Sequence, residues 1–171
     1  EHVPDRQLRD GDIFKAGEVS IETIETPGHT ANHLCFSIAG GDMLLSADHV
    51  MGWSTSIVAP PDGSMRDYMA SIEKLMARPE QTYHPGHGGH IDDAHAYVAE
   101  LKQHRLRREQ SILSEISGSE KSIPEIVATL YASVDPSLHR AAALSVFAHL
   151  EDLVERGLAS AHPVISLSAR Y

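Results

Sequence analysis

Apolar and polar residues alternate in the first part of the chain, and the period changes further on. Apolar side chains at Val19, Ile21 and Ile24 alternate with polar ones, and two apolar runs cover residues 33–38 and 43–47. Alternation with a period near two is typical of strands with one buried face. Residues 39–42, with two glycines and an aspartate, predict a hairpin turn. We therefore expect consecutive antiparallel strands here, after a polar N-terminal loop over residues 1–12 and a short strand at 13–14.

A helical period begins after Ser64, a good N-cap residue, with apolar positions spaced three and four apart up to Met76. Pro79 ends this helix, and a strand follows at residues 81–84. The next helix is capped by Asp92 or Asp93 and extends to Ile116. Between these elements, we expect residues 54–59 to form a strand. Strands that alternate with helices in this order favour a layered α/β fold.

From Ser119 onward the pattern is helical only. Ser122 and Glu125 form a capping box, and a further helix opens at residues 136–137 and ends at Gly157. Residues 158–167, interrupted by Pro163, predict a two-stranded wing. Helix, helix and wing together are typical of a winged-helix domain. We place a first domain at residues 1–103 and a winged-helix-like domain at residues 104–171.

Composition and net charge limit the kinds of partner that the protein is expected to bind. The 171 residues carry a formal net charge of −10, and an acidic surface argues against general nucleic-acid binding. Arg105, Arg107 and Arg108 form the main basic cluster, which we interpret as a solvated helix face. No apolar run is long enough for a membrane span. A single cysteine, Cys35, excludes an internal disulfide and fits a reducing compartment, and we expect its side chain to be buried. We therefore expect a cytoplasmic protein, and the absence of a long apolar run predicts no membrane contact.

Three polar residues follow apolar runs, where strand ends present functional side chains. His29 lies in a Thr-Pro-Gly-His-Thr loop, Asp48 closes the run at 43–47, and His87 stands between two glycines. Imidazole and carboxylate are both suitable ligands for a borderline metal such as zinc. The series therefore predicts a metal site at one edge of the sheet.

These motifs resemble a known family. Residues 26–30, 46–49 and 85–88 are similar to the later metal-binding motifs of the metallo-β-lactamase superfamily. The run 48–55 and the tail after His87 resemble its branch with a C-terminal winged helix, the β-lactamase-like protein 2 type. The resemblance implies an α/β fold in which this chain is the C-terminal part of an αββα sandwich. It also implies two zinc ions: His29 binds the first, Asp48 bridges both and takes part in catalysis, and His87 binds the second. Many relatives have glycine where this chain has Ala47.

The signature motif of the family, His-x-His-x-Asp-His, does not occur in this sequence, in which His2 is the only histidine before His29. We expect these residues to be the C-terminal portion of a longer enzyme, with the remaining ligands upstream. Three ligands do not hold two zinc ions, so we expect this chain alone to be inactive. Half a sandwich exposes apolar surface, so we expect it to pair with the missing upstream segment or to form a homo-oligomer.

The family mechanism is hydrolysis by a metal-activated water, and the resemblance implies a small-molecule substrate with an ester, thioester, amide or phosphodiester bond. The sequence leaves these four open. One alternative is a nuclease acting on RNA or single strands; another is a non-catalytic assembly or nucleic-acid-binding module built on the winged helix. Candidate pocket residues are His49, Trp53 and His84, and Trp53 could equally be a lid over the core. His33 is expected near the site.

Overall fold

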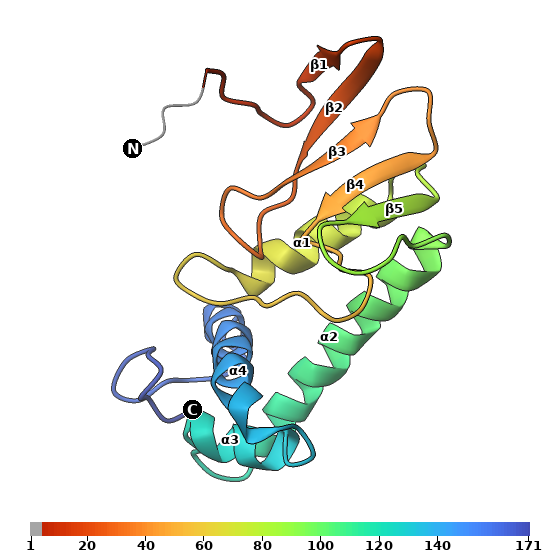
Figure 1. The fold of residues 1–171 in the computed structure, drawn as a ribbon. Helices are drawn as coiled ribbons and strands as arrows, with labels where there is room; N and C mark the ends of the chain where they lie inside the picture. Colours follow the sequence, from red (N-terminus) through yellow and green to blue (C-terminus); the bar gives the residue numbers. More distant parts are fainter. Residues whose placement is uncertain (1–4) are drawn as a thin grey trace.

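The computed structural model describes residues 5–171, so the first four residues of the expected N-terminal loop lie outside the described residues. A five-stranded sheet has the order β1-β2-β3-β4-β5 (Figure 1). The first four strands are antiparallel neighbours: β1 (Ile13–Ala16), β2 (Val19–Glu25), β3 (Leu34–Ile38) and β4 (Met43–Ala47). The last, β5 (Thr82–Pro85), returns parallel to β4 after a helical crossover.

The strands predicted from alternation are confirmed, as is the hairpin turn between β3 and β4. Gly40 takes φ +78° there, a conformation that costs glycine little. Alternate residues such as Cys35 and Leu44 are fully buried on one face of the sheet. This face packs against helices. The alternation of apolar and polar residues along each strand therefore indicates which side of the strand is buried in the core.

Two helices cover that face (Figure 1). Helix α1 (Met65–Met76) begins at Ser64, whose Oγ accepts a hydrogen bond from the Asp67 amide at 3.2 Å. Helix α2 (Ala94–Ile116) begins at Asp93, whose carboxylate accepts from the Ala96 amide at 3.1 Å. Both caps were predicted. The shared core contains the buried apolar faces of the sheet and of both helices, including Ile24, Leu44, Tyr68, Ile72, Leu75, Tyr83 and Val98.

The far half of α2 belongs to a second core with α3 (Ile123–Leu130), a short 3₁₀ turn η1 (Pro136–Leu138) and α4 (His139–Glu155). The predicted capping box is confirmed: Glu125 accepts hydrogen bonds from both the amide and the hydroxyl of Ser122. Helix α4 also contacts α1, where Arg66 pairs with Asp152 at 3.2 Å and with Glu155 at 2.7 Å. The C-terminal helices therefore pack directly against the sheet-bearing part.

Three expectations were wrong. Residues 54–59 form an irregular loop rather than a strand, because their polar groups bond to residues of the site and of α2 instead of a sheet edge. The wing has no strand after α4 within residues 5–171, only isolated bridges from Arg170 to His162 and to Ser122, since Pro163 has no amide hydrogen to extend a ladder. Arg105 is 3% exposed rather than part of a solvated face.

Cys35 is buried and free, as expected. Within the described residues, no helix has the length and apolar character that a membrane crossing needs.

Candidate metal site and adjoining groove

His29 lies in the loop after β2, and its ring is fixed by a backbone contact. Nδ1 lies 2.6 Å from the carbonyl oxygen of Ile57. A carbonyl oxygen only accepts, so Nδ1 carries the proton and donates it. In a neutral ring with this tautomer, the other nitrogen, Nε2, keeps its lone pair. Histidines that bind metals commonly have this tautomer and this kind of partner.

Asp48 and His87 follow neighbouring strands, β4 and β5, and their side chains meet. His87 Nε2 lies 3.6 Å from Asp48 Oδ1, and both groups are open to solvent. Gly86 makes this approach possible: a Cβ atom at that position would lie 2.7 Å from the same Asp48 oxygen. The parallel pairing of β4 with β5 brings together two residues that are far apart in the sequence.

His33 lies near both His29 and Asp48. Its ring centroid is 6.1 Å from that of His29, and its Nε2 accepts a hydrogen bond from the Asp48 amide at 3.3 Å. Nδ1 therefore bears the proton and donates to Thr26 Oγ1 at 2.8 Å. Burial, and then the charge of His29, lower the pKa of His33, and the nearby Asp48 carboxylate partly opposes this shift. His33 holds the backbone at Asp48, so its expected place near the site is confirmed.

The loop after Asp48 is tied to the core. Ser56 donates to the carbonyl oxygens of Asp48 at 2.5 Å and His49 at 2.9 Å, and the Tyr68 hydroxyl donates to His49 at 3.0 Å. The His49 ring itself is fully buried, and neither of its nitrogens has a hydrogen-bond partner within residues 5–171. Burial lowers the pKa of His49 to about 3, so the ring is neutral. It lies beneath the site, and contact with a substrate would require this packing to change.

The other two predicted pocket residues are at the surface. Trp53 is 73% exposed and follows Gly52, whose amide donates to the His87 carbonyl oxygen at 2.9 Å. His84 is exposed and stacks on His90 with ring centroids 6.0 Å apart. Their roles at a substrate pocket stay predictions.

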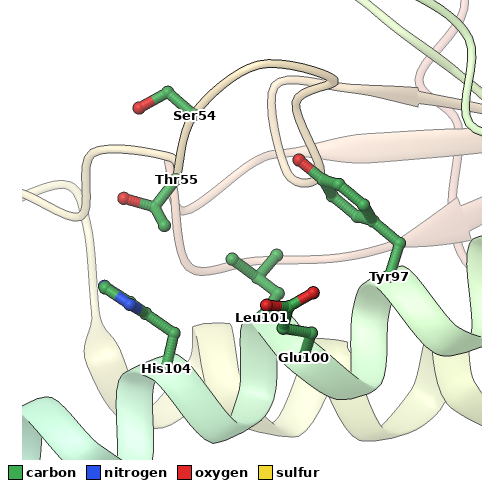
Figure 2. Close-up of a pocket in the computed structure, with 6 residues that line it drawn as sticks. All are labelled: Ser54, Thr55, Tyr97, Glu100, Leu101 and His104. Carbon is green, nitrogen blue, oxygen red and sulfur yellow. The ribbon is translucent and has the colours of Figure 1, made fainter.

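An elongated groove that sequence patterns did not indicate runs between the loop at 54–57 and helix α2. Figure 2 shows one end of it: Ser54 and Thr55 lie on the loop opposite Tyr97, Leu101 and His104 of the helix. Tyr97 anchors this end, because its hydroxyl donates to the Met51 carbonyl oxygen at 2.7 Å. Only folding brings this loop to α2, so no local motif marks the groove.

The chemistry of the donors fits a divalent metal. His29 offers a free ring nitrogen, and Asp48 and His87 face each other without other side-chain partners in the part of the chain that is described. Residues 5–171 do not, however, contain a group of three or more histidine, cysteine or acidic side chains gathered closely enough to hold an ion. Within residues 5–171, the three predicted ligands therefore do not form a complete metal site by themselves, and their role as ligands stays a prediction.

Comparison with protein families gives two matches. Residues 2–87 match the model described as Metallo-beta-lactamase superfamily, and residues 122–163 match the Beta-lactamase associated winged helix domain.

Individual proteins agree with these matches. The chain is 29% identical over 147 residues to a Beta-lactamase-like protein 2 homolog of Drosophila melanogaster, covering 84% of this chain and 49% of the relative. It is 27% identical over 153 residues to an Atrochrysone carboxyl ACP thioesterase of Aspergillus chevalieri, covering 83% and 48%. The chain thus spans about half the length of these curated relatives.

Solved structures show the same fold. The crystal structure of a Beta-lactamase domain protein from Burkholderia ambifaria superposes with a TM-score of 0.87 at 22% identity, over 99% of this chain and 53% of that one. The expected α/β fold with a C-terminal winged helix is therefore confirmed.

Proposed function

This chain belongs to the metallo-β-lactamase superfamily and carries its associated winged-helix domain, and from this membership we propose that the protein is a metal-dependent hydrolase of thioesters. His29, Asp48 and His87 are the metal ligands that this part of the protein contributes, and zinc is the metal we propose. Additional ligands come from residues outside this set.

The observation that carries the proposal is the contact between His29 Nδ1 and the Ile57 carbonyl oxygen. The Nδ1 proton is donated to Ile57 at 2.6 Å, which orients the ring and leaves Nε2 as a ligand. A histidine whose only role was to cap a turn would not need this long-range bond across 28 residues. His33 adds support, because its bond to the Asp48 amide fixes the backbone from which the carboxylate projects.

When bound, the metal would supply an activated water and polarise the scissile carbonyl group. The chain's own residues do the positioning. The Asp48 carboxylate lies 3.6 Å from His87 Nε2, so these two proposed ligands present their donor atoms side by side. Ser56 and Tyr68 hold the two carbonyl groups that follow β4, so the carboxylate keeps its place as substrate enters.

The choice of thioester over ester, amide or phosphodiester is supported by the relatives. Several are named as acyl carrier protein (ACP) thioesterases, including those of Aspergillus chevalieri and Aspergillus aculeatus. The acidic net charge of −10 disfavours the nuclease alternative, since a phosphodiester backbone would be repelled at long range.

The test is metal content and thioester hydrolysis of the natural full-length protein and its Asp48→Asn variant. Loss of one ligand should lower metal affinity by at least about tenfold, because even partners of ligands are worth that much. Asp92→Asn is the matched control, since Asp92 is an exposed aspartate that pairs with His90 instead. Unchanged metal stoichiometry in Asp48→Asn would contradict the ligand assignment. Hydrolysis of an oxygen ester but not of its thioester counterpart would contradict the substrate class.

A further inference from the structure

The groove beside α2 continues past His104 into the junction between the two parts of the molecule. Its walls are the loop at 54–57, helix α2, and the segment from Tyr131 to Ser145 that leads into α4. This inner section encloses about 340 Å³, a size that suits part of a small-molecule ligand. It is therefore a junction groove built by both domains.

The junction groove is cationic in an acidic protein. Arg105 and Arg108 line it together with His104, and no acidic side chain of the described residues does. Arg105 is 3% exposed: one Nη donates to the Ser56 carbonyl oxygen, the other lies 3.5 Å from Ser145 Oγ, and Nε has no partner within residues 5–171. The Tyr68 ring, whose centre lies 5.0 Å from Arg105 Cζ, offsets part of the cost of burying this charge, and an anion in the groove would offset more of it.

The local field acts on neighbouring groups as well. The pKa of His104 is lowered by burial and then by the charges of Arg105 and Arg108. A site with this field favours a negatively charged ligand group over a neutral one.

Apolar side chains form much of the remaining wall, together with the hydroxyl groups of serine and threonine residues on the loop and on α4. Ile57 and Leu138, which are 49% and 55% exposed, flank the groove with Val134 and Ala141. The Arg108 guanidinium lies 4.2 Å above the centre of the Tyr131 ring and donates one hydrogen bond to the Leu130 carbonyl oxygen at 3.3 Å, which fixes its plane and leaves its other N–H groups as donors. The groove therefore combines an anion-binding end with a strip that covers a flexible chain.

The junction groove also reaches the candidate metal site. Ile57 lines the groove with its side chain, and its carbonyl oxygen holds His29. A ligand that extends along the groove past Ile57 arrives at the ring of a proposed metal ligand.

We propose that the junction groove binds the phosphopantetheine arm of an acyl thioester, with its phosphate at Arg108 and Arg105 and its thioester directed toward His29. This inference rests on the proposed thioesterase function and names the carrier of the substrate. The arm has the required chemistry: a phosphate at one end, a flexible amide chain, and the thioester sulfur at the other. Coenzyme A and a carrier protein both present this arm.

Binding is measured by calorimetry on the 171-residue chain without metal, using 4′-phosphopantetheine and, as the matched ligand, pantetheine, which lacks the phosphate. The variants are Arg108→Gln and the control Arg107→Gln, which removes the same charge from the next residue, an exposed one outside the groove. We expect Arg108→Gln to weaken the binding of phosphopantetheine about tenfold, because one charged hydrogen bond to the phosphate is lost. The binding of pantetheine should weaken by less than about twofold. Arg107→Gln should change neither by more than about twofold.

A second variant guards against misfolding of Arg108→Gln. Ala141→Leu fills the groove without a charge change and should weaken both ligands, with an unchanged far-ultraviolet spectrum as the check on folding. Equal weakening by Arg107→Gln and Arg108→Gln, or equal affinity for the two ligands, would overturn the proposal. So would single-stranded RNA that binds in the groove more tightly than phosphopantetheine and is released by Arg108→Gln.

Two further measurements identify which molecule carries the phosphopantetheine arm. They also keep this inference separate from the proposed hydrolysis. Coenzyme A and a holo carrier protein are compared as ligands; tighter binding of either identifies the carrier, and binding of neither overturns the inference. Because these measurements need no metal, their failure leaves the Asp48→Asn test of thioester hydrolysis intact. Loss of hydrolysis alone would equally leave the binding result standing.

Discussion

Ala47 has a left-handed backbone conformation, with φ at +45°, at the point where β4 ends and Asp48 begins. It is the one non-glycine residue among those described that has a positive φ. A Cβ atom in this region clashes with the backbone at a cost of about 1–2 kcal/mol. The family resemblance already singled out this position, because many relatives are expected to have glycine there. The strain is therefore located at the residue that turns the chain toward a proposed metal ligand.

We predict that Ala47→Gly stabilises the protein by up to about 1 kcal/mol, because relief of the left-handed strain exceeds the added freedom of glycine when unfolded. Urea denaturation of the variant and the parent measures the difference. Ala16→Gly, in β1, is the control and should destabilise, since no strain is relieved there. Equal losses in the two variants would show that Ala47 is unstrained.

At the scale of elements, helices α2 and α4 meet through groups that sequence patterns do not identify. His149 of α4 is buried, and neither ring nitrogen has a partner in residues 5–171. Burial, and then the charges of Arg105 and Arg108, lower the pKa of His149 to about 3. The ring is thus neutral when folded and titrates near its usual value of 6.5 when unfolded. Its contribution to stability is complete above pH 6.5 and is lost as the pH falls toward 3.

This predicts acid sensitivity of the junction between α2 and α4. Between pH 8 and pH 5, His149 should lower the free energy of unfolding by about 2 kcal/mol, since the unfolded state binds a proton that the folded state does not. His149→Leu should remove this share of the pH dependence, measured by denaturation at both pH values. Burial also lowers the pKa of His49 to about 3, so His49 still contributes its own part of the pH dependence in the His149→Leu variant. His90→Gln, at an exposed position, is the control and should leave the change of unfolding free energy with pH as it is in the parent. If His149→Leu also kept the parent's pH dependence, His149 would not be the source of the acid sensitivity.

At the scale of the whole molecule, the sheet has helices on one face only (Figure 1). Strand register places Phe36 opposite Leu45, and Leu45 opposite His84, on the other face. Phe14 adds an edge contact to Phe36 at 6.2 Å between centroids. Leu45 is 37% exposed, and Phe14 and Phe36 on the same face are half-buried. An apolar sheet face of this kind is typically covered by another layer.

We predict that the 171-residue chain by itself self-associates through this face. Light scattering at increasing concentration should show dimers or larger species, and Leu45→Lys should reduce them. Leu158→Lys is the control, because Leu158 is similarly exposed but follows α4, away from the sheet. A chain that stays monomeric at all concentrations, or an equal effect of both variants, would contradict this role of the sheet face.

Local patterns identified much of the molecule. The strands from Val19 to Ala47, the caps at Ser64 and Asp93 and the capping box at Ser122 follow from residues close together in sequence, so they were predictable. The wing was overestimated because the apolar residues of 158–167 favoured strands, although Pro163, visible in the sequence, lacks the amide hydrogen that a ladder needs. The burial of Arg105 could not be predicted, since a three-residue basic run on a helix usually faces solvent.

The sequence by itself determined the family, the fold class and the three candidate ligands His29, Asp48 and His87, because these depend on short motifs and on local hydrogen bonding. Only the tertiary structure decided which groups meet: His29 with Ile57, Asp48 with His87, and Arg105 with the loop at Ser56. These contacts join residues 28 to 49 positions apart. Such pairs are brought together by sheet register and helix packing, whose free energy is spread over the core rather than encoded at either residue.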